Sequence, residues 1–158
     1  MAICSGAIKR RAAIHSLIRL GPGPPVNDAD RTLLRELRQV LLNLHKTLID
    51  WQRTEYEMDH GPMGTTQLLQ VIFSDEAFAW LRPMSGLIVS IDEALEAKPP
   101  ETPAAGPIIG QARELASPAA GTAYSTRYHA ALQELPDAVL AHRDLVTLLK
   151  LHNPQASA

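Results

Sequence analysis

The chain has 158 residues, of which 46% are hydrophobic and 20% are charged, and its formal net charge is −2. This length fits one domain with a buried core, and the charge balance provides no basic excess for binding phosphates, so we expect no nucleic-acid partner. No apolar run approaches the roughly 20 residues that span a bilayer. The single cysteine, Cys4, excludes an intrachain disulfide and a cysteine-based zinc site. We therefore expect a soluble, cytoplasmic protein that carries no cofactor and does not associate with membranes.

The first 25 residues differ in charge from the rest of the chain. They contain no acidic residue and four basic ones: Lys9, Arg10, Arg11 and Arg19. The rest holds the other 11 of the 15 basic residues against all 17 acidic ones, a net charge of −6. Glycine and proline at 21–25 cannot sustain a helix. We expect a basic flexible leader over 1–26, one helical domain over 27–153 and a tail over 154–158; a transit peptide or a membrane-surface helix is the alternative for the leader.

The first predicted helix has clear signals at both ends. Asn27 can cap it, and nothing interrupts the pattern until Gly61 and Pro62. A short apolar segment then runs from Thr65 or Thr66 to Phe73. The sequence Ser74-Asp75-Glu76 is typical of another helix start, which predicts a second long helix to about residue 98. Pro83 lies inside this second helix and predicts a kink or break near Ala79.

Prolines mark the organisation of the second half. Four of them predict an extended loop at about 99–107: Pro99, Pro100, Pro103 and Pro107. A short helix follows to about Ala116, then Ser117-Pro118 predicts the start of a helix reaching Glu134. Pro136 begins the last helix, which ends near residue 152.

The pattern predicts an all-α fold. No strand-like alternation is sustained, and four main amphipathic helices with one long connection are typical of an antiparallel bundle. An irregular orthogonal array of helices, or a half-bundle completed by dimerisation, is the alternative.

Several polar residues fall on apolar helix faces, where an unpaired charge is costly. At about 100° per residue, Glu55 and, at the margin, Asp59 share the face of the leucine stripe in the first helix. Arg82 is the natural counter-charge for either of them, and such a pair would fix the crossing of the first two helices. Asp92 flanks the apolar face of the second long helix, and His142 occupies the centre of the last helix's stripe, where we expect it to be largely buried. These five residues form the candidate buried polar cluster.

Two arrangements could supply metal ligands. Glu57 and His60 have the Glu-x-x-His spacing of di-metal bundles, but no second copy of that motif occurs and Glu57 lies opposite the leucine stripe. Glu55, Asp59 and His142 are better oriented and provide only three ligands. We therefore predict no metal site and assign no catalytic residue.

The segment Phe78-Ala-Trp-Leu-Arg-Pro-Met-Ser, followed by Leu87-Ile-Val-Ser-Ile-Asp-Glu, resembles a family of small uncharacterised bacterial proteins. Leu44-His-Lys-Thr-Leu-Ile-Asp and Glu55-Tyr-Glu, earlier in the chain, belong to the same resemblance, which covers roughly residues 41–95. The resemblance implies a soluble helical protein and carries no catalytic residue across.

Two classes of function fit these features. The first is a non-enzymatic helical module that binds a protein partner or itself through an apolar patch: Leu68, Leu69, Val71, Ile72 and Phe73. The alternative is a small-molecule or metal-dependent enzyme with a site between the first two helices and the last, built from Glu55, Asp59, Arg82 and His142. A third hypothesis, binding to a membrane surface, depends on the basic leader.

Overall fold

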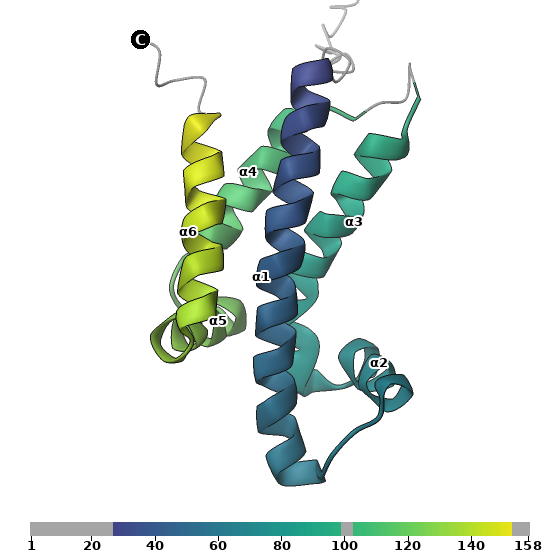
Figure 1. Cartoon of the computed structure of the whole chain (residues 1–158), viewed down its shortest axis with the longest axis vertical. Coiled ribbons are helices and arrows are strands. Elements are labelled where there is room, and N and C mark those ends of the chain that lie inside the picture. The colour runs from purple at the N-terminus through teal and green to yellow at the C-terminus, as the bar shows by residue number, and fades with distance from the viewer. Residues whose placement is uncertain (1–26, 99–102, 153–158) are drawn as a thin grey trace, which may run out of the picture.

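The computed structural model describes residues 27–98 and 103–152, and every regular element in these ranges is helical (Figure 1). The elements are α1 (Asp28–His60), α2 (Thr65–Ser74), the 3-10 helix η1 (Glu76–Leu81), α3 (Arg82–Glu96), α4 (Ala105–Ala116), α5 (Ala123–Glu134) and α6 (Pro136–Leu151). The all-α prediction is therefore confirmed for the described part of the chain. None of these helices combines the length and the apolar character needed to cross a membrane. The predicted leader, the predicted tail and residues 99–102 of the predicted loop lie outside the described residues.

Local signals set the two ends of α1. The side-chain oxygen of Asn27 accepts a hydrogen bond from the backbone N–H of Asp30 at 2.8 Å, which satisfies one of the free donors of the first turn. At the other end Gly61 has a φ of +83°, and its N–H donates to the Glu57 carbonyl. Both ends are those that the sequence predicted.

The second long helix of the prediction is two elements in the structure. The chain runs as the 3-10 helix η1, capped by the Asp75 side chain, which accepts from the Ala77 N–H at 2.9 Å. The α-helix begins only at Arg82, so Pro83 lies in the first turn of α3. A proline there loses no helical hydrogen bond, because the first N–H groups of a helix have no partner within it. Pro83 thus starts a helix, whereas the sequence placed it inside one.

The boundary between α4 and α5 also differs from the prediction. Ser117 ends α4, and α5 begins after Thr122, whose hydroxyl accepts from the Ser125 N–H while the Ser125 hydroxyl accepts from the Thr122 N–H. Gly121 precedes this capping box with a φ of +93°, a turn conformation that interrupts any helix from Ser117. The predicted helix start at Ser117-Pro118 is therefore wrong.

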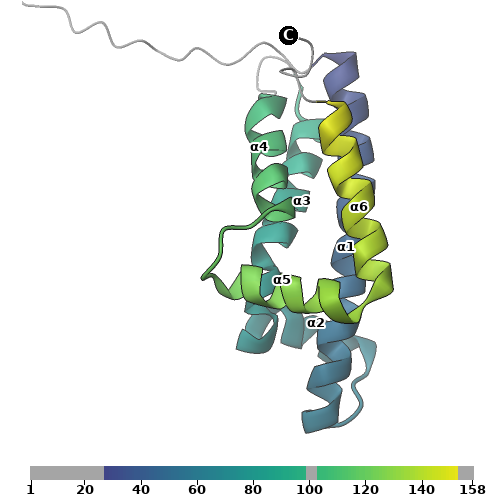
Figure 2. The same ribbon diagram turned by 90° about the vertical axis from the view of Figure 1, so that its left-hand side faces the viewer.

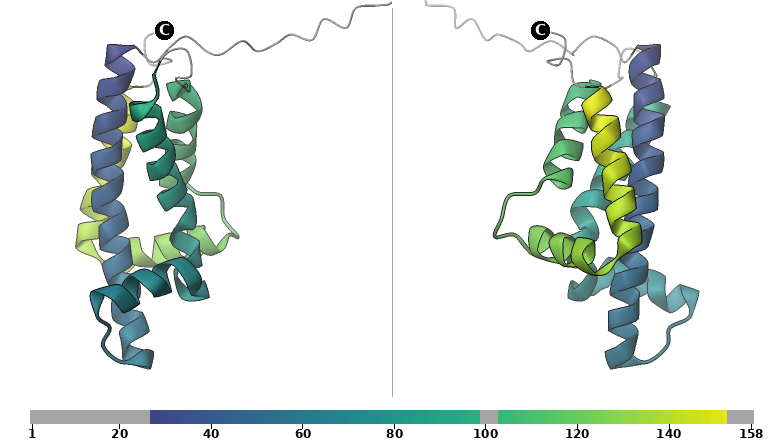
Figure 3. Two further views of the ribbon diagram at one scale, coloured as in Figure 1. Left: turned by 90° about the vertical axis from the view of Figure 1, so that its right-hand side faces the viewer. Right: turned by 60° about the vertical axis from the view of Figure 1, so that its left-hand side comes forward.

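Helices α1, α3, α4 and α6 lie along one another, and α5 runs across their lower part (Figures 1 and 2). Contacts join α1 to α3 and α6, and α4 to α3 and α6, while α5 contacts α6 and η1. The sequence had placed the α5 region among the main helices and treated α4 as a minor one. Helix α2 stands apart beside the lower end of α1 and makes its main contact with η1 (Figure 3).

The core follows the leucine stripe of α1. Its residues recur every three or four positions and so form one buried face: Leu33, Leu34, Leu37, Leu41, Leu44, Leu48 and Trp51. Below Trp51 the helix continues for more than two turns with side chains that are mostly half-buried or exposed. The lower half of the molecule therefore brings polar side chains and aromatic rings close to solvent.

Candidate functional site

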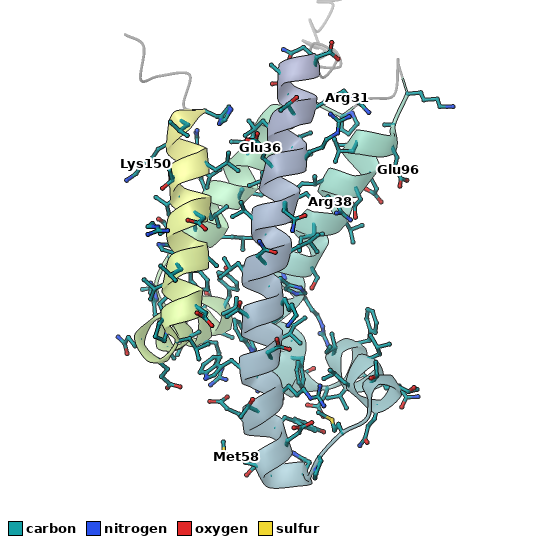
Figure 4. All side chains as sticks on the ribbon, in the orientation of Figure 1. Arg31, Glu36, Arg38, Met58, Glu96 and Lys150 are labelled. Atoms are coloured by element: carbon teal, nitrogen blue, oxygen red, sulfur yellow. The ribbon has the colours of Figure 1, made fainter. Side chains whose placement is uncertain are left out.

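The structure separates the residues of the predicted polar cluster. Glu55 forms an ion pair with Arg127 of α5, a partner that the sequence had not suggested. Asp92 pairs with Arg38, which points from α1 toward α3 (Figure 4). Residues 38 and 55 are about 25 Å apart along α1 at 1.5 Å per residue. Glu55 and Asp92 therefore belong to two distant contacts.

Arg82 and Asp59 are both exposed, and neither makes an ion pair or side-chain hydrogen bond within the described ranges. The predicted ion pair between Arg82 and a carboxylate of α1 is not observed, and Glu55 pairs with Arg127 instead. The reason is the boundary at Leu81: because α3 begins at Arg82, this side chain projects from a first turn on the surface.

His142 is half-buried, and its Nδ1 lies 2.8 Å from the Tyr128 hydroxyl. Burial, together with the nearby His129, lowers the pKa of His142 below 6.5. Burial also raises the pKa of Tyr128, so the phenol stays protonated and can donate to the neutral imidazole. This pair joins α5 to α6 and lacks the carboxylates that the sequence had grouped with His142.

Several polar and aromatic side chains meet where α1, η1 and α5 come together. We name this group the Arg127 cluster, and it consists of Trp51, Gln52, Glu55, Trp80, Arg127 and Glu134. The Arg127 guanidinium lies over the Trp51 ring at 4.3 Å and 5.7 Å from the Trp80 ring, so it is attracted to both indoles. The two indoles meet edge to face, with centroids 6.3 Å apart. Glu55 accepts from Arg127 on the solvent side, with both side chains about one third exposed.

Gln52 connects the cluster internally, and its side chain is only 6% exposed. Its Oε1 accepts two hydrogen bonds, one from Trp80 Nε1 at 2.8 Å and one from Arg127 Nη2 at 2.9 Å. Both partners are donors only, so the oxygen must face them and the orientation of the amide is fixed. The amide nitrogen Nε2 then has no acceptor among the residues that the structure describes, and a buried unpaired donor costs about 1–3 kcal/mol.

The other indole is also satisfied. Trp51 Nε1 donates to Glu134 Oε2 at 3.0 Å, at the last residue of α5. Arg127 and Glu134 are two turns apart, so they attach two points of α5 to α1. These contacts determine how α5 crosses the other helices.

A surface hollow of about 360 Å³ opens beside the cluster. We name it the Gln52 hollow, and it is lined by Gln52, Glu55, Glu76, Ala77, Ala79, Trp80, Ala123 and Arg127. Three alanines contribute only methyl groups, and this leaves the space open between the larger side chains. The lining offers carboxylates, an amide, a guanidinium and an indole, and it contains no hydroxyl, thiol, imidazole or amine. Such a lining is suited to binding through hydrogen bonds and charge.

Arg127 was not among the residues predicted from the sequence, because the counter-charge of Glu55 was expected on the next helix, at Arg82. A signal was present: tryptophan is the preferred ring for an arginine, and Trp51, Gln52 and Glu55 share one side of α1. What the sequence lacked was the direction of α5, which decides whether Arg127 reaches that side.

A serine and a histidine also meet between α1 and α3. Ser85 Oγ lies 2.9 Å from His45 Nε2, and it also lies 3.2 Å from the Leu81 carbonyl. If the hydroxyl donates to the carbonyl, the imidazole N–H donates to the hydroxyl, and every proton has an acceptor. Burial lowers the pKa of His45, which favours this neutral form. Neither residue is among those that line four surface hollows in the described part of the chain, so we interpret the contact as a link between two packed helices.

Glu57 and His60, which have the spacing of metal ligands in the sequence, make other contacts in the structure. Glu57 accepts from Arg53 at 2.8 Å and from the Met63 N–H at 3.0 Å, and these bonds lower its pKa. His60 stacks on Tyr56 with centroids 3.9 Å apart. In the described ranges, no three or more His, Cys, Asp or Glu side chains are grouped so as to hold a metal ion.

Besides the Gln52 hollow, helix α2 presents an unusual surface. None of its ten residues is buried, although five of them are large and apolar. Leu68, Val71 and Ile72 pack against the core, whereas Leu69 is 53% and Phe73 is 79% exposed. We name the last two the α2 apolar face.

Comparisons of the chain with protein-family models, with curated proteins and with solved structures gave no match. The resemblance of the Phe78–Ser85 segment to small bacterial proteins therefore stays a prediction.

Proposed function

We propose that this chain is a non-enzymatic helical module that associates with a second copy of itself through α2. The observation that carries the proposal is the α2 apolar face, where Leu69 and Phe73 lie one turn apart and exposed. A surface helix needs one apolar side to hold it on the core, and Leu68, Val71 and Ile72 provide that side. Leu69 and Phe73 add apolar area that the fold of one chain does not use.

The composition of α2 favours a second copy over a different partner. The ten residues contain no charge, and their polar side chains are those of Thr65, Thr66, Gln67, Gln70 and Ser74. In a two-fold interface each surface meets itself, so a charged helix would face its own charge. Hydroxyl and amide groups carry both a donor and an acceptor, which lets each of them pair with its own copy.

The energetics predict a weak dimer. Burying a leucine or phenylalanine side chain contributes about 1.5–3 kcal/mol, so two from each copy contribute roughly 6–12 kcal/mol. Association itself costs about 4–15 kcal/mol. The most favourable combination of these ranges leaves about 8 kcal/mol, so the dissociation constant is about 1 μM at the tightest, and we expect a value between this limit and the millimolar range.

Sedimentation velocity over roughly 0.01–1 mM protein tests the proposal. The unaltered chain is expected to shift from monomer to dimer across this range, and the double variant Leu69→Gln/Phe73→Gln is expected to remain monomeric. Met58→Gln is the matched control, because Met58 is 74% exposed on the side of α1 away from α2 (Figure 4). A monomer at every concentration, or equal loss of the dimer in the control, would contradict the proposal.

Two finer expectations belong to the same proposal. The framework that carries α2 is an antiparallel bundle of α1, α3, α4 and α6, supported by the contacts around that ring of helices. The compartment is the cytoplasm, where a chain with a single cysteine needs no oxidising environment for its fold. Fractionation of cells that produce the full chain checks the second expectation.

A further inference from the structure

The buried amide of Gln52 plays no part in the proposed dimer contact, and among the described residues it has an unpaired donor. Its oxygen is held by Trp80 and Arg127, and its Nε2 group has no acceptor in residues 27–98 or 103–152. A polar group this deeply buried is normally paired, with protein, with water or with a ligand. Gln52 is one of the residues that line the Gln52 hollow, which is open to solvent.

Arg127 adds donors at the same place. Its guanidinium has five N–H bonds, and the contacts with Gln52 and Glu55 are both made through Nη2. The Nε and Nη1 groups make no hydrogen bond to any residue of the described ranges. The donors of Arg127 and Gln52 together suit a carboxylate, which accepts several hydrogen bonds at once.

Two acidic side chains also line the hollow. Glu76 is exposed and makes no ion pair with the described residues, and Glu55 presents a second carboxylate. With Arg127 the lining has a net charge of −1, so a simple anion would be repelled at the entrance. A ligand that carries its own ammonium group removes this conflict.

We propose that the Gln52 hollow binds a small zwitterion of the amino-acid type. Its carboxylate accepts from Gln52 Nε2 and Arg127, and its ammonium donates to Glu76. The methyl groups of Ala77, Ala79 and Ala123 leave room for a small apolar side chain. A volume of about 360 Å³ lies at the lower end of known ligand pockets, which fits a ligand of this size.

Intrinsic fluorescence gives a direct measurement, because Trp51 and Trp80 are the only tryptophans of the chain and both belong to the Arg127 cluster. The full chain is titrated with L-alanine, L-glutamine and L-phenylalanine, which span side-chain size. Acetate and ethylamine are the matched probes that carry only one of the two charged groups. We expect a saturable change in emission with at least one amino acid at roughly 0.1–10 mM, and at least tenfold weaker responses to acetate and ethylamine.

Three variants assign the effect to the site. Gln52→Glu keeps an oxygen for Trp80 and Arg127 and replaces the free donor by an acceptor, so the apparent affinity should fall at least tenfold. Glu76→Gln changes an exposed side chain, does not threaten the fold and should weaken binding severalfold. Glu93→Gln, an exposed change on α3 outside the hollow, should leave the titration unchanged.

Several results of these titrations would overturn the proposed ligand site. No saturable change with any of the three amino acids, or equal responses to acetate or ethylamine, overturns the proposal. An unchanged titration in Glu76→Gln overturns it even if Gln52→Glu does not fold. Because monomeric Leu69→Gln/Phe73→Gln retains the hollow, the same titration in that variant separates ligand binding from self-association.

Discussion

The Arg127 cluster and the α2 apolar face place polar and apolar side chains in opposite ways. In the cluster, an arginine, a glutamine and two carboxylates lie beside two nearly buried indoles, and both indole N–H groups and the Gln52 oxygen are paired. On α2, a leucine and a phenylalanine point into solvent. The cluster fixes α5 through directed contacts, whereas α2 is held by one apolar side alone. The difference indicates that α5 belongs to the rigid part of the fold and that α2 is available for contact.

The two phenylalanines of the chain provide the sharpest test of this contrast. Phe78 in η1 is 1% exposed, and Phe73 in α2, five residues earlier, is mostly exposed. Phe78→Ala is expected to lower the free energy of unfolding by about 3–5 kcal/mol, because it leaves a cavity in the core. Phe73→Ala is expected to change it by no more than about 0.5 kcal/mol. Urea denaturation at low protein concentration measures both, and equal effects would show that α2 is as firmly packed as η1.

Arg127 gives the next largest effect. Arg127→Gln removes the contacts to both indoles and leaves Glu55 unpaired, so we expect a loss of about 1–3 kcal/mol in the free energy of unfolding. Arg82→Gln is the matched control and should have an effect within about 0.5 kcal/mol.

A double-mutant cycle with Glu55→Gln then measures the pairing. Coupling of Glu55 to Arg127, and none to Arg82, is the expected result. Coupling to Arg82 instead would restore the pairing that the sequence had predicted and would contradict the position of α5.

Hydrogen exchange compares the two helices without any substitution. Because α2 has no buried residue and α5 buries Tyr124, Ser125, Tyr128 and Ala131, the amides of α2 should open locally at lower free energy. We expect protection factors in α2 to be lower by tenfold or more, as an order of magnitude. Similar protection in both helices, measured on the monomeric double variant, would remove the basis for treating α2 as loosely held.

The smallest expected effect is the loss of stability at acidic pH that protonation of His45 causes. Burial lowers the pKa of His45 below its value of 6.5 in the unfolded chain, so the unfolded state binds more protons as the pH falls through that region. Stability should therefore be complete above pH 6.5 and should decline as the pH falls from 6.5 toward the lowered value. Replacing His45 by glutamine should reduce this decline, as measured by thermal melts between about pH 7 and pH 5. An unchanged decline would assign the acid sensitivity to other groups.

Part of the candidate site was predictable. Glu55 was singled out because a carboxylate on the leucine-stripe side of α1 needs a partner, and it has one. Leu69 and Phe73 were part of the predicted patch, and both are exposed, whereas Leu68, Val71 and Ile72 from the same patch pack on the core. The apolar character of α2 was predictable from the sequence, whereas the side of α2 that faces the rest of the molecule was not.

The sequence by itself determined the helical class and the limits of α1 and α6, because caps, glycines and prolines act within one turn of the residues that they affect. It did not determine the start of α5 or the partner of Glu55. Arg127 is 72 positions from Glu55, and their meeting depends on how α5 crosses α1, which the packing of the whole core decides. Only the tertiary structure could therefore reveal the Arg127 cluster and the hollow beside Gln52.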